Sequence, residues 1–314
     1  MFRKERKFNK ISSPPLEKII EGLSLDDTPY TPSSRSIVHS LPPAVLDAVF
    51  SHFDSREALA LSATCKQFQP YATWAYKELR FVLGQPERPE TLVATLETIR
   101  SLLLVLQSRA DYATSVRSIT LCDPIPPVVT PFDEKAVVWE AWDLLVENLD
   151  ELIAQVITQT PMLRHFAWSD YSVRFYMNGT RSIAQLKKLQ HLQSLSTFRV
   201  YGQSADYDIT SQDCAPPLER FVVDCLHSAP YWYLPFLRGN NRLRSLDLRF
   251  PGHPEDRKWL QELCMAGLSW SNLRTLNITC TEDEAPWMIH LMRHCAVGFM
   301  WRIVFERSLT IVVT

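Results

Sequence analysis

A short apolar pattern, LxxLxL, recurs six times after residue 110 and constrains the fold more than any other feature of the sequence. The copies are VRSITL from Val116, LRHFAW from Leu163, LSTFRV from Leu195, LERFVV from Leu218, LRSLDL from Leu243 and LRTLNI from Leu273. Successive copies begin 47, 32, 23, 25 and 30 residues apart. Self-similarity at such a period indicates an array of stacked units, each of which buries its apolar face only against its neighbours.

Each copy is expected to supply one short strand. Its last two apolar residues alternate along the strand and face a shared core, while the residues between them face outward. Parallel strands need connections that return the chain to the same edge, and several connections are helical in sequence. The segment from Asp133 to Thr158 has one apolar stripe, made of Val138, Trp142, Leu145, Leu149, Leu152 and Val156. Helices are also predicted within residues 91–109 and 258–267, so residues 82–314 are expected to form an irregular α/β solenoid of short parallel strands and helices.

Residues 37–81 have a different pattern of apolar residues, which predicts three short helices. The first has a helical stripe made of Val45, Leu46, Val49, Phe50 and Phe53. Asp54 and Glu57 have the spacing of a capping box and begin the second helix. The third runs from Cys65 to Leu79 and is interrupted by Pro70. Residues 1–36 combine a basic decapeptide with a stretch rich in Ser, Pro and Thr, which predicts a disordered tail; its basic residues fit a solvated end better than a nuclear-import signal.

The order Leu41-Pro42, Val45-Leu46, Val49-Phe50, Leu59, Cys65-Lys66 and Trp74 to Leu79 resembles an F-box, the adaptor-binding module of ubiquitin-ligase substrate receptors. Together with the repeats that follow, the chain resembles fungal F-box proteins with degenerate leucine-rich repeats. That resemblance implies a three-helix F-box followed by an irregular leucine-rich-repeat solenoid. It also implies a function as substrate-recognition subunit of a Skp-cullin-F-box ubiquitin ligase, in which the F-box binds the Skp adaptor and through it a cullin. The alternative is a protein-interaction scaffold outside any ligase, with a degenerate F-box.

The adaptor-binding residues implied by the resemblance are Leu41, Pro42, Leu46, Phe50, Leu59, Cys65, Phe68 and Trp74. A module of about forty residues cannot bury every apolar side chain. We therefore expect Leu41, Pro42, Leu46, Phe50 and Leu59 to stay partly exposed as an apolar strip.

The substrate is expected on the outward face of the strands, for which the sequence offers Arg199, Tyr201, Arg220, Asp224, Asp247 and Arg249. If Arg199, Arg220 and Arg249 stand on successive strands, their guanidinium groups converge on a carboxylate or phosphate of a protein target. The alternative is that they pair internally with Asp224 and Asp247. A second candidate contact is Trp232, in the aromatic run YWY between two prolines.

Composition narrows the function classes. A net charge of -2 gives no global field for nucleic acid, and no glycine pattern typical of phosphate-binding loops occurs. Seven scattered cysteines without CxxC, and a start without an apolar signal segment, predict a cytoplasmic or nuclear location. His290, His294 and Cys295 lack the further ligands of a zinc site, so no metal or cofactor is expected. No membrane span and no catalytic constellation is recognised, so we expect a binding protein and not an enzyme.

The last residues form two strand-like runs, Ile303 to Phe305 and Leu309 to Val313. Two outcomes are open: one more strand pairing on the edge of the repeats, or a ragged, aggregation-prone tail.

Overall fold

The computed structural model describes residues 41–64, 66, 68–83, 89–122, 139–169, 180–198, 216–224, 234–237, 240–249, 270–280, 301–306 and 308–313. The chain forms two compact units, Met1–Leu46 and Asp47–Thr314. The first is described only from residue 41, at the start of helix α2 (Pro43–Phe50). The predicted tail at residues 1–36 lies outside the described part.

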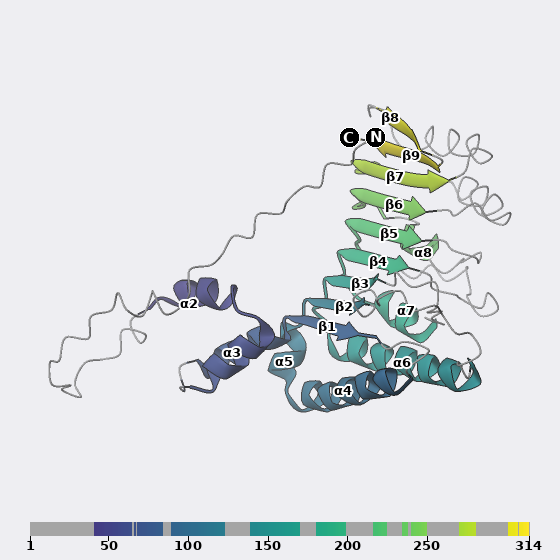
Figure 1. Cartoon of the computed structure of the whole chain (residues 1–314). Coiled ribbons are helices and arrows are strands. Elements are labelled where there is room, and N and C mark those ends of the chain that lie inside the picture. Colours follow the sequence, from purple (N-terminus) through teal and green to yellow (C-terminus); the bar gives the residue numbers. More distant parts are fainter. Residues whose placement is uncertain are drawn as a thin grey trace, which may run out of the picture. The chain divides into compact units, whose positions relative to one another are not determined.

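The second unit is built on one sheet with strand order β1-β2-β3-β4-β5-β6-β7-β9-β8. The strands are β1 (Glu78–Val82), β2 (Ser118–Cys122), β3 (His165–Ser169), β4 (Ser194–Phe198), β5 (Arg220–Asp224), β6 (Ser245–Arg249), β7 (Thr275–Cys280), β8 (Trp301–Glu306) and β9 (Ser308–Val313). Strands β1 to β7 are all parallel and follow one another in chain order (Figure 1). Parallel strands that alternate with helices confirm the predicted α/β class, in an arrangement consistent with leucine-rich-repeat-like architecture.

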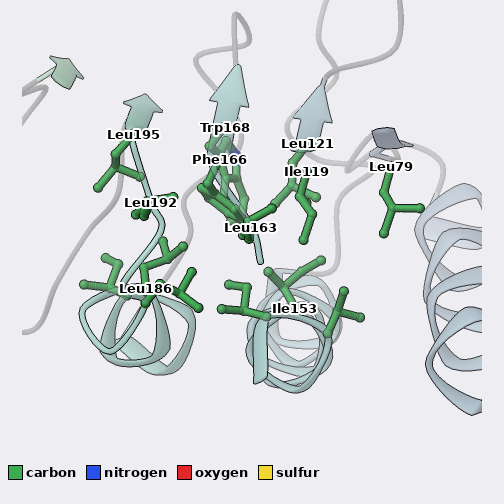
Figure 2. Packing of buried hydrophobic residues seen from close by; sticks show 14 of the residues in the cluster. Leu79, Ile119, Leu121, Ile153, Leu163, Phe166, Trp168, Leu186, Leu192 and Leu195 are labelled. Atoms are coloured by element: carbon green, nitrogen blue, oxygen red, sulfur yellow. The ribbon is translucent and has the colours of Figure 1, made fainter. Parts of the chain in front are cut away.

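Helices return the chain between strands and cover one face of the sheet. They are α4 (Pro89–Ser108), α5 (Ala110–Ser115), α6 (Trp139–Gln159), α7 (Thr180–Leu186) and α8 (Leu234–Leu237). The stripe predicted for α6 is confirmed from Trp142 to Val156, because four of these residues are buried and Leu145 packs on the core. Figure 2 shows the packing: Ile153 of α6 and Leu186 of α7 lie opposite the apolar residues of the strands. Residues 133–138 and the helix predicted at 258–267 lie outside the described part.

A backbone ladder fixes the spacing of the repeats just before each strand. The carbonyl of Lys77 accepts hydrogen bonds from the amides of Arg117 and Ser118, at 2.8 and 3.1 Å. The same double acceptance repeats at the carbonyls of Arg117, Arg164, Gln193, Glu219 and Arg244. Six consecutive steps of one geometry make the position after the first apolar residue of each copy equivalent across the sheet.

The turns that lead into β3, β4, β6 and β7 each contain a buried residue three positions before the first apolar residue of the copy. These residues are Thr160, Leu189, Asn240 and Trp270. The three with polar side chains donate to carbonyls of the preceding helix: Thr160 Oγ1 to Val156 O at 3.0 Å, Asn240 Nδ2 to Phe236 O at 3.3 Å, and Trp270 Nε1 to Leu237 O at 3.1 Å. The turns are therefore satisfied internally, as burial of polar groups requires.

The predicted frame of the third copy, which was placed at Leu195, is wrong by three residues. Strand register pairs Leu195 with Phe166 of β3 and with Phe221 of β5, so Leu195 is the second apolar position of its copy and not the first. Leu192, which is fully buried, is the first (Figure 2). Starts at 163, 192 and 218 give more even spacing than the sequence pattern suggested. Phe198 is then the last residue of β4, opposite Asp224 of β5.

The helix predicted to end at Leu79 is also wrong. The third helix is a 3-10 helix (η2, Gln69–Tyr76), in which Pro70 lies in the first turn, where the missing N–H costs nothing. Leu79 belongs to β1, where it pairs with Ile119. Tyr76, Leu79 and Phe81 thus form an additional copy of the repeat that the sequence analysis missed, and the predicted division between residues 81 and 82 falls within β1.

The C-terminal runs form the strand predicted as one of two outcomes. Strand β9 pairs antiparallel with β7, Ile278 opposite Ile311, and β8 pairs antiparallel with β9. Reversal of direction ends the parallel array and covers the edge of β7.

Candidate functional site

An aromatic cluster organises the short helices that follow residue 47. Phe50 is only 1% exposed, stacks on Tyr71 with ring centroids 4.5 Å apart, and meets Phe53 and Phe68 edge-on at 5.7 Å. Ala58 of α3 (Ser55–Ser62) and Ala75 of η2 complete the buried part. The expectation that Phe50 is exposed for an adaptor is therefore wrong, because the ring is the centre of its own cluster. Leu46 is likewise buried, at 6% exposure.

Other apolar side chains of α2 and α3 are exposed instead. Val45 and Val49 lie one turn apart on α2 and are 42% and 41% exposed, and Leu59 on α3 is 41% exposed. Phe53 is exposed beside them in sequence, and Pro42 is exposed while Leu41 is half-buried. The predicted exposure of Pro42 and Leu59 is confirmed. We name Val49, Phe53 and Leu59 the helical apolar surface.

Capping residues hold α3 in place. Asp54 accepts a hydrogen bond from the Glu57 amide at 2.8 Å, and the Glu57 carboxylate accepts one from the Asp54 amide at 3.0 Å. The capping box predicted from the spacing is confirmed. It orients a helix of eight residues, which is too short to be stable by itself.

The 3-10 helix carries the remaining predicted adaptor residues. Phe68 and Trp74 are half-buried against the aromatic cluster, and the Lys77 ammonium lies 4.1 Å from the centre of the Trp74 ring. Cys65 lies outside the described residues. At the end of η2, Tyr76 stacks on Tyr112 of α5 with ring centroids 4.4 Å apart. Burial and the nearby Tyr112 raise the pKa of Tyr76.

The strand register places the predicted substrate residues in separate rows. Arg220 lies opposite Ser245, whereas Arg249 lies opposite Asp224 at the other end of the same strands. Four residues along a strand span about 13 Å, so Arg220 and Arg249 do not converge as expected. Internal pairing of Arg249 with Asp224 therefore stays a prediction. Arg199, Tyr201 and Trp232 lie outside the described part, and Asp247 lies opposite Asn277 in the middle row.

Sequence reasoning missed the basic residues at the start of the strands. The position after the first apolar residue of each copy holds Lys77, Arg117, Arg164, Gln193, Glu219, Arg244 and Arg274. Arginine follows the first residue in VRSI, LRHF, LRSL and LRTL, which is the signal that could have revealed this row. Burial, and then the neighbouring Arg164, lower the pKa of Arg117.

A polar hollow of about 320 Å³ opens on this row, lined by Glu219, Arg242, Arg244, Asn272 and Arg274. Arg244 lies 3.7 Å from Glu219 in an exposed ion pair. Asn272 Nδ2 donates to Asn241 O at 2.6 Å, which ties the turns of two successive copies together.

One buried carboxyl lies within the helical layer. Asp150 of α6 accepts hydrogen bonds from the amides of Arg181 and Ser182 at 2.9 and 3.1 Å and from the Ser182 hydroxyl at 2.5 Å. It thereby caps the start of α7 from a neighbouring helix. Desolvation raises its pKa, although these hydrogen bonds oppose the shift.

No cluster of three His, Cys, Asp or Glu residues suited to a metal occurs in the described ranges. By length and composition alone α4 could cross a membrane. Leu92, Leu96, Ile99 and Leu106 of α4 are nevertheless buried in the core shared with the strands. That packing accounts for the apolar character of this helix.

Comparison with protein-family models found no match, and comparison with curated proteins found no significant match.

Proposed function

We propose that this chain is the substrate-recognition subunit of a Skp-cullin-F-box ubiquitin ligase. In this role the short helices of residues 41–81 bind a Skp-family adaptor and through it a cullin, and the repeats bind a protein target. The chain makes and breaks no bond itself. It raises the effective concentration of a target lysine near the conjugating enzyme, in the cytosol or nucleus. Nucleic acid, membrane and cofactors have no part in this proposal.

One observation carries the proposal: Val49, Phe53 and Leu59 of the helical apolar surface are exposed, although the same short helices bury Phe50, Ala58 and Ala75 in the aromatic cluster. The order of apolar residues in residues 41–81 resembles an F-box. On α2, Leu46 and Phe50 are buried, whereas Val45 and Val49 remain exposed and can contact a partner. Val49 and Leu59 are each about two-fifths exposed, on two different helices. Exposed apolar side chains on short helices are typical of a protein-binding surface.

The test is co-purification of a Skp-family adaptor with the full chain and with a Val49→Asp/Leu59→Asp variant. A charge placed in an apolar interface loses its hydration without gaining a partner, so adaptor capture should fall at least tenfold. Both residues are exposed, so the melting temperature should change little. Leu104→Asp/Leu144→Asp is the matched control, because these side chains are also exposed, at 67% and 60%, but lie on α4 and α6.

Adaptor capture that survives the Val49/Leu59 change would contradict the proposal. Absence of any adaptor with the unaltered chain, while a target still co-purifies, would favour the alternative of a scaffold with a degenerate F-box.

A further inference from the structure

The polar hollow at the start of β5, β6 and β7 combines charge, donors and room in a way that points to an anionic ligand. It is lined by three arginines and one glutamate, so its formal charge is positive. Its volume of about 320 Å³ is roughly ten times the share of one water molecule in the liquid. A phosphate group with part of its hydration fits into such a space.

The backbone holds the arginines in position. Arg244 and Arg274 occupy equivalent places in the ladder, since the Arg274 amide donates to the Arg244 carbonyl at 2.8 Å. Their side chains therefore start about 4.8 Å apart, the spacing of neighbouring strands. Arg242 extends from the turn before β6, where its amide donates to Asn240 Oδ1 at 3.2 Å, and Asn240 is itself buried.

The guanidinium groups remain available to a ligand. Of the three arginines that line the hollow, only Arg244 has an ion-pair partner among the described residues. Its contact with Glu219 is exposed, and the two charged groups lie 3.7 Å apart. Exposed pairs of this kind are weak and exchange readily with other partners. Planar guanidinium groups bind phosphate oxygens through paired N–H donors, which a single ammonium cannot match.

We infer that this hollow binds a phosphorylated serine or threonine of the target protein. The inference rests on the proposed role of the repeats as the target-binding part. A phosphopeptide suits the site better than nucleic acid because the basic row is interrupted: Gln193 and Glu219 separate Arg164 from Arg244. A nucleic-acid backbone needs a continuous track of cations, whereas one phosphate group needs one cluster.

The experiment measures fluorescence anisotropy with the full chain at fixed salt. The probe is a pool of labelled peptides with random flanks around one central phosphoserine, and the reference pool has serine in its place. The phosphorylated pool should bind at least tenfold more tightly, and inorganic phosphate should compete with it. Arg242→Ala/Arg244→Ala/Arg274→Ala should abolish the preference for phosphate, and the corresponding triple lysine variant should recover only part of it.

The matched control is Arg56→Ala/Arg100→Ala/Arg164→Ala, which removes the same charge from exposed arginines outside the hollow. It should keep the preference for the phosphorylated pool. Equal binding of the two pools, or equal losses in both triple variants, would overturn the inference. Competition by a single-stranded oligonucleotide as strong as that by the phosphopeptide pool would overturn it in favour of nucleic acid.

The two proposals fail separately. The hollow variant should still capture the adaptor, and the Val49→Asp/Leu59→Asp variant should still prefer the phosphorylated pool. Loss of the adaptor interaction alone would count against the ligase function, and loss of the phosphate preference alone would count against the hollow.

Discussion

The aromatic cluster of the short helices and the core of the repeat sheet both bury apolar side chains, but the two cores differ greatly in size. Phe50, Ala58 and Ala75 are the buried members of the first, with partly buried aromatic rings around them. The core of the sheet is continuous from Leu79 to Leu276, because each strand adds residues to the layer of its neighbour. A small cluster has few residues to enclose its apolar surface, whereas a stacked array builds one continuous core from many copies, even though Leu104 and Leu144 remain exposed on its helices. Surface left over after folding is what a partner can bind.

This comparison also separates two kinds of binding surface. The helical apolar surface is a remainder of incomplete burial, so its residues are a valine, a phenylalanine and a leucine. The hollow of Arg242, Arg244 and Arg274 is a product of repetition, since equivalent positions on successive copies bring like residues together. The first suits an apolar partner and the second an anionic one.

The largest expected effect comes from removing the centre of each core. Phe50→Ala should cost about 3 to 5 kcal/mol, which the small cluster cannot absorb, so residues 47–76 should lose hydrogen-exchange protection while β3 to β6 keep theirs. Phe221→Ala removes the same side chain from the sheet, where it is fully buried and 6.0 Å from Phe236. That variant should lower the melting temperature of the whole repeat array. Equal loss of protection in β3 to β6 with Phe50→Ala would show that the two cores are not independent.

A smaller effect is expected at the cap between two helices of the repeat layer. Asp150→Ala removes three hydrogen bonds, two of them from the amides of Arg181 and Ser182 at the start of α7, which should cost about 2 kcal/mol. The loss should appear in thermal unfolding of the array and not in exchange of residues 47–76. A change below a few tenths of a kcal/mol would mean that α7 does not depend on this cap.

The same carboxyl should make the array sensitive to pH. Burial raises the pKa of Asp150 above 3.8, so the ionised form is less favoured in the folded state than in the unfolded state. As pH rises above 3.8 the unfolded chain loses this proton first, and stability falls until the folded-state pKa is passed. Asp150→Asn does not ionise, so the difference in melting temperature between this variant and the wild type should change in favour of the variant over that interval. A constant difference across pH would contradict the raised pKa.

The smallest effect is expected at the capping box of α3. Asp54→Ala should cost about 1 kcal/mol and should increase hydrogen exchange in residues 55–62 only. Asp47→Ala is the matched control, because it removes an exposed carboxylate from α2 without removing a cap. An effect of equal size in the control would assign the loss to charge and not to the cap.

Local signals were sufficient for several elements. Asp54 and Glu57 predicted the start of α3 because a capping box involves only neighbouring residues. The stripe from Trp142 to Val156 predicted the buried face of α6, since helical periodicity is visible along one segment. The repeated LxxLxL pattern predicted the parallel strands, because each copy is short and visible within one contiguous segment of the sequence.

The candidate sites were less predictable. The stripe of α2 includes Val45, Val49 and Phe50 alike, and nothing in its spacing shows which side faces Tyr71 and which remains exposed. The hollow joins three arginines from two copies of the repeat, and only the alignment of copies reveals that Arg244 and Arg274 are equivalent.

By itself the sequence determined that this chain forms parallel strands joined by helices, with a short helical segment before them, because periodicity and capping are properties of contiguous residues. The tertiary structure alone decided the frame of the copy around Leu195. Both Leu192 and Leu195 are followed by an apolar residue three positions later, and only the pairing of Leu195 with Phe166 and Phe221 makes Leu192 the first position. It also decided that Leu79 lies in a strand and that Phe50 is a core residue. In each case the sequence allowed two local solutions, and contact with a segment distant in the chain selected one of them.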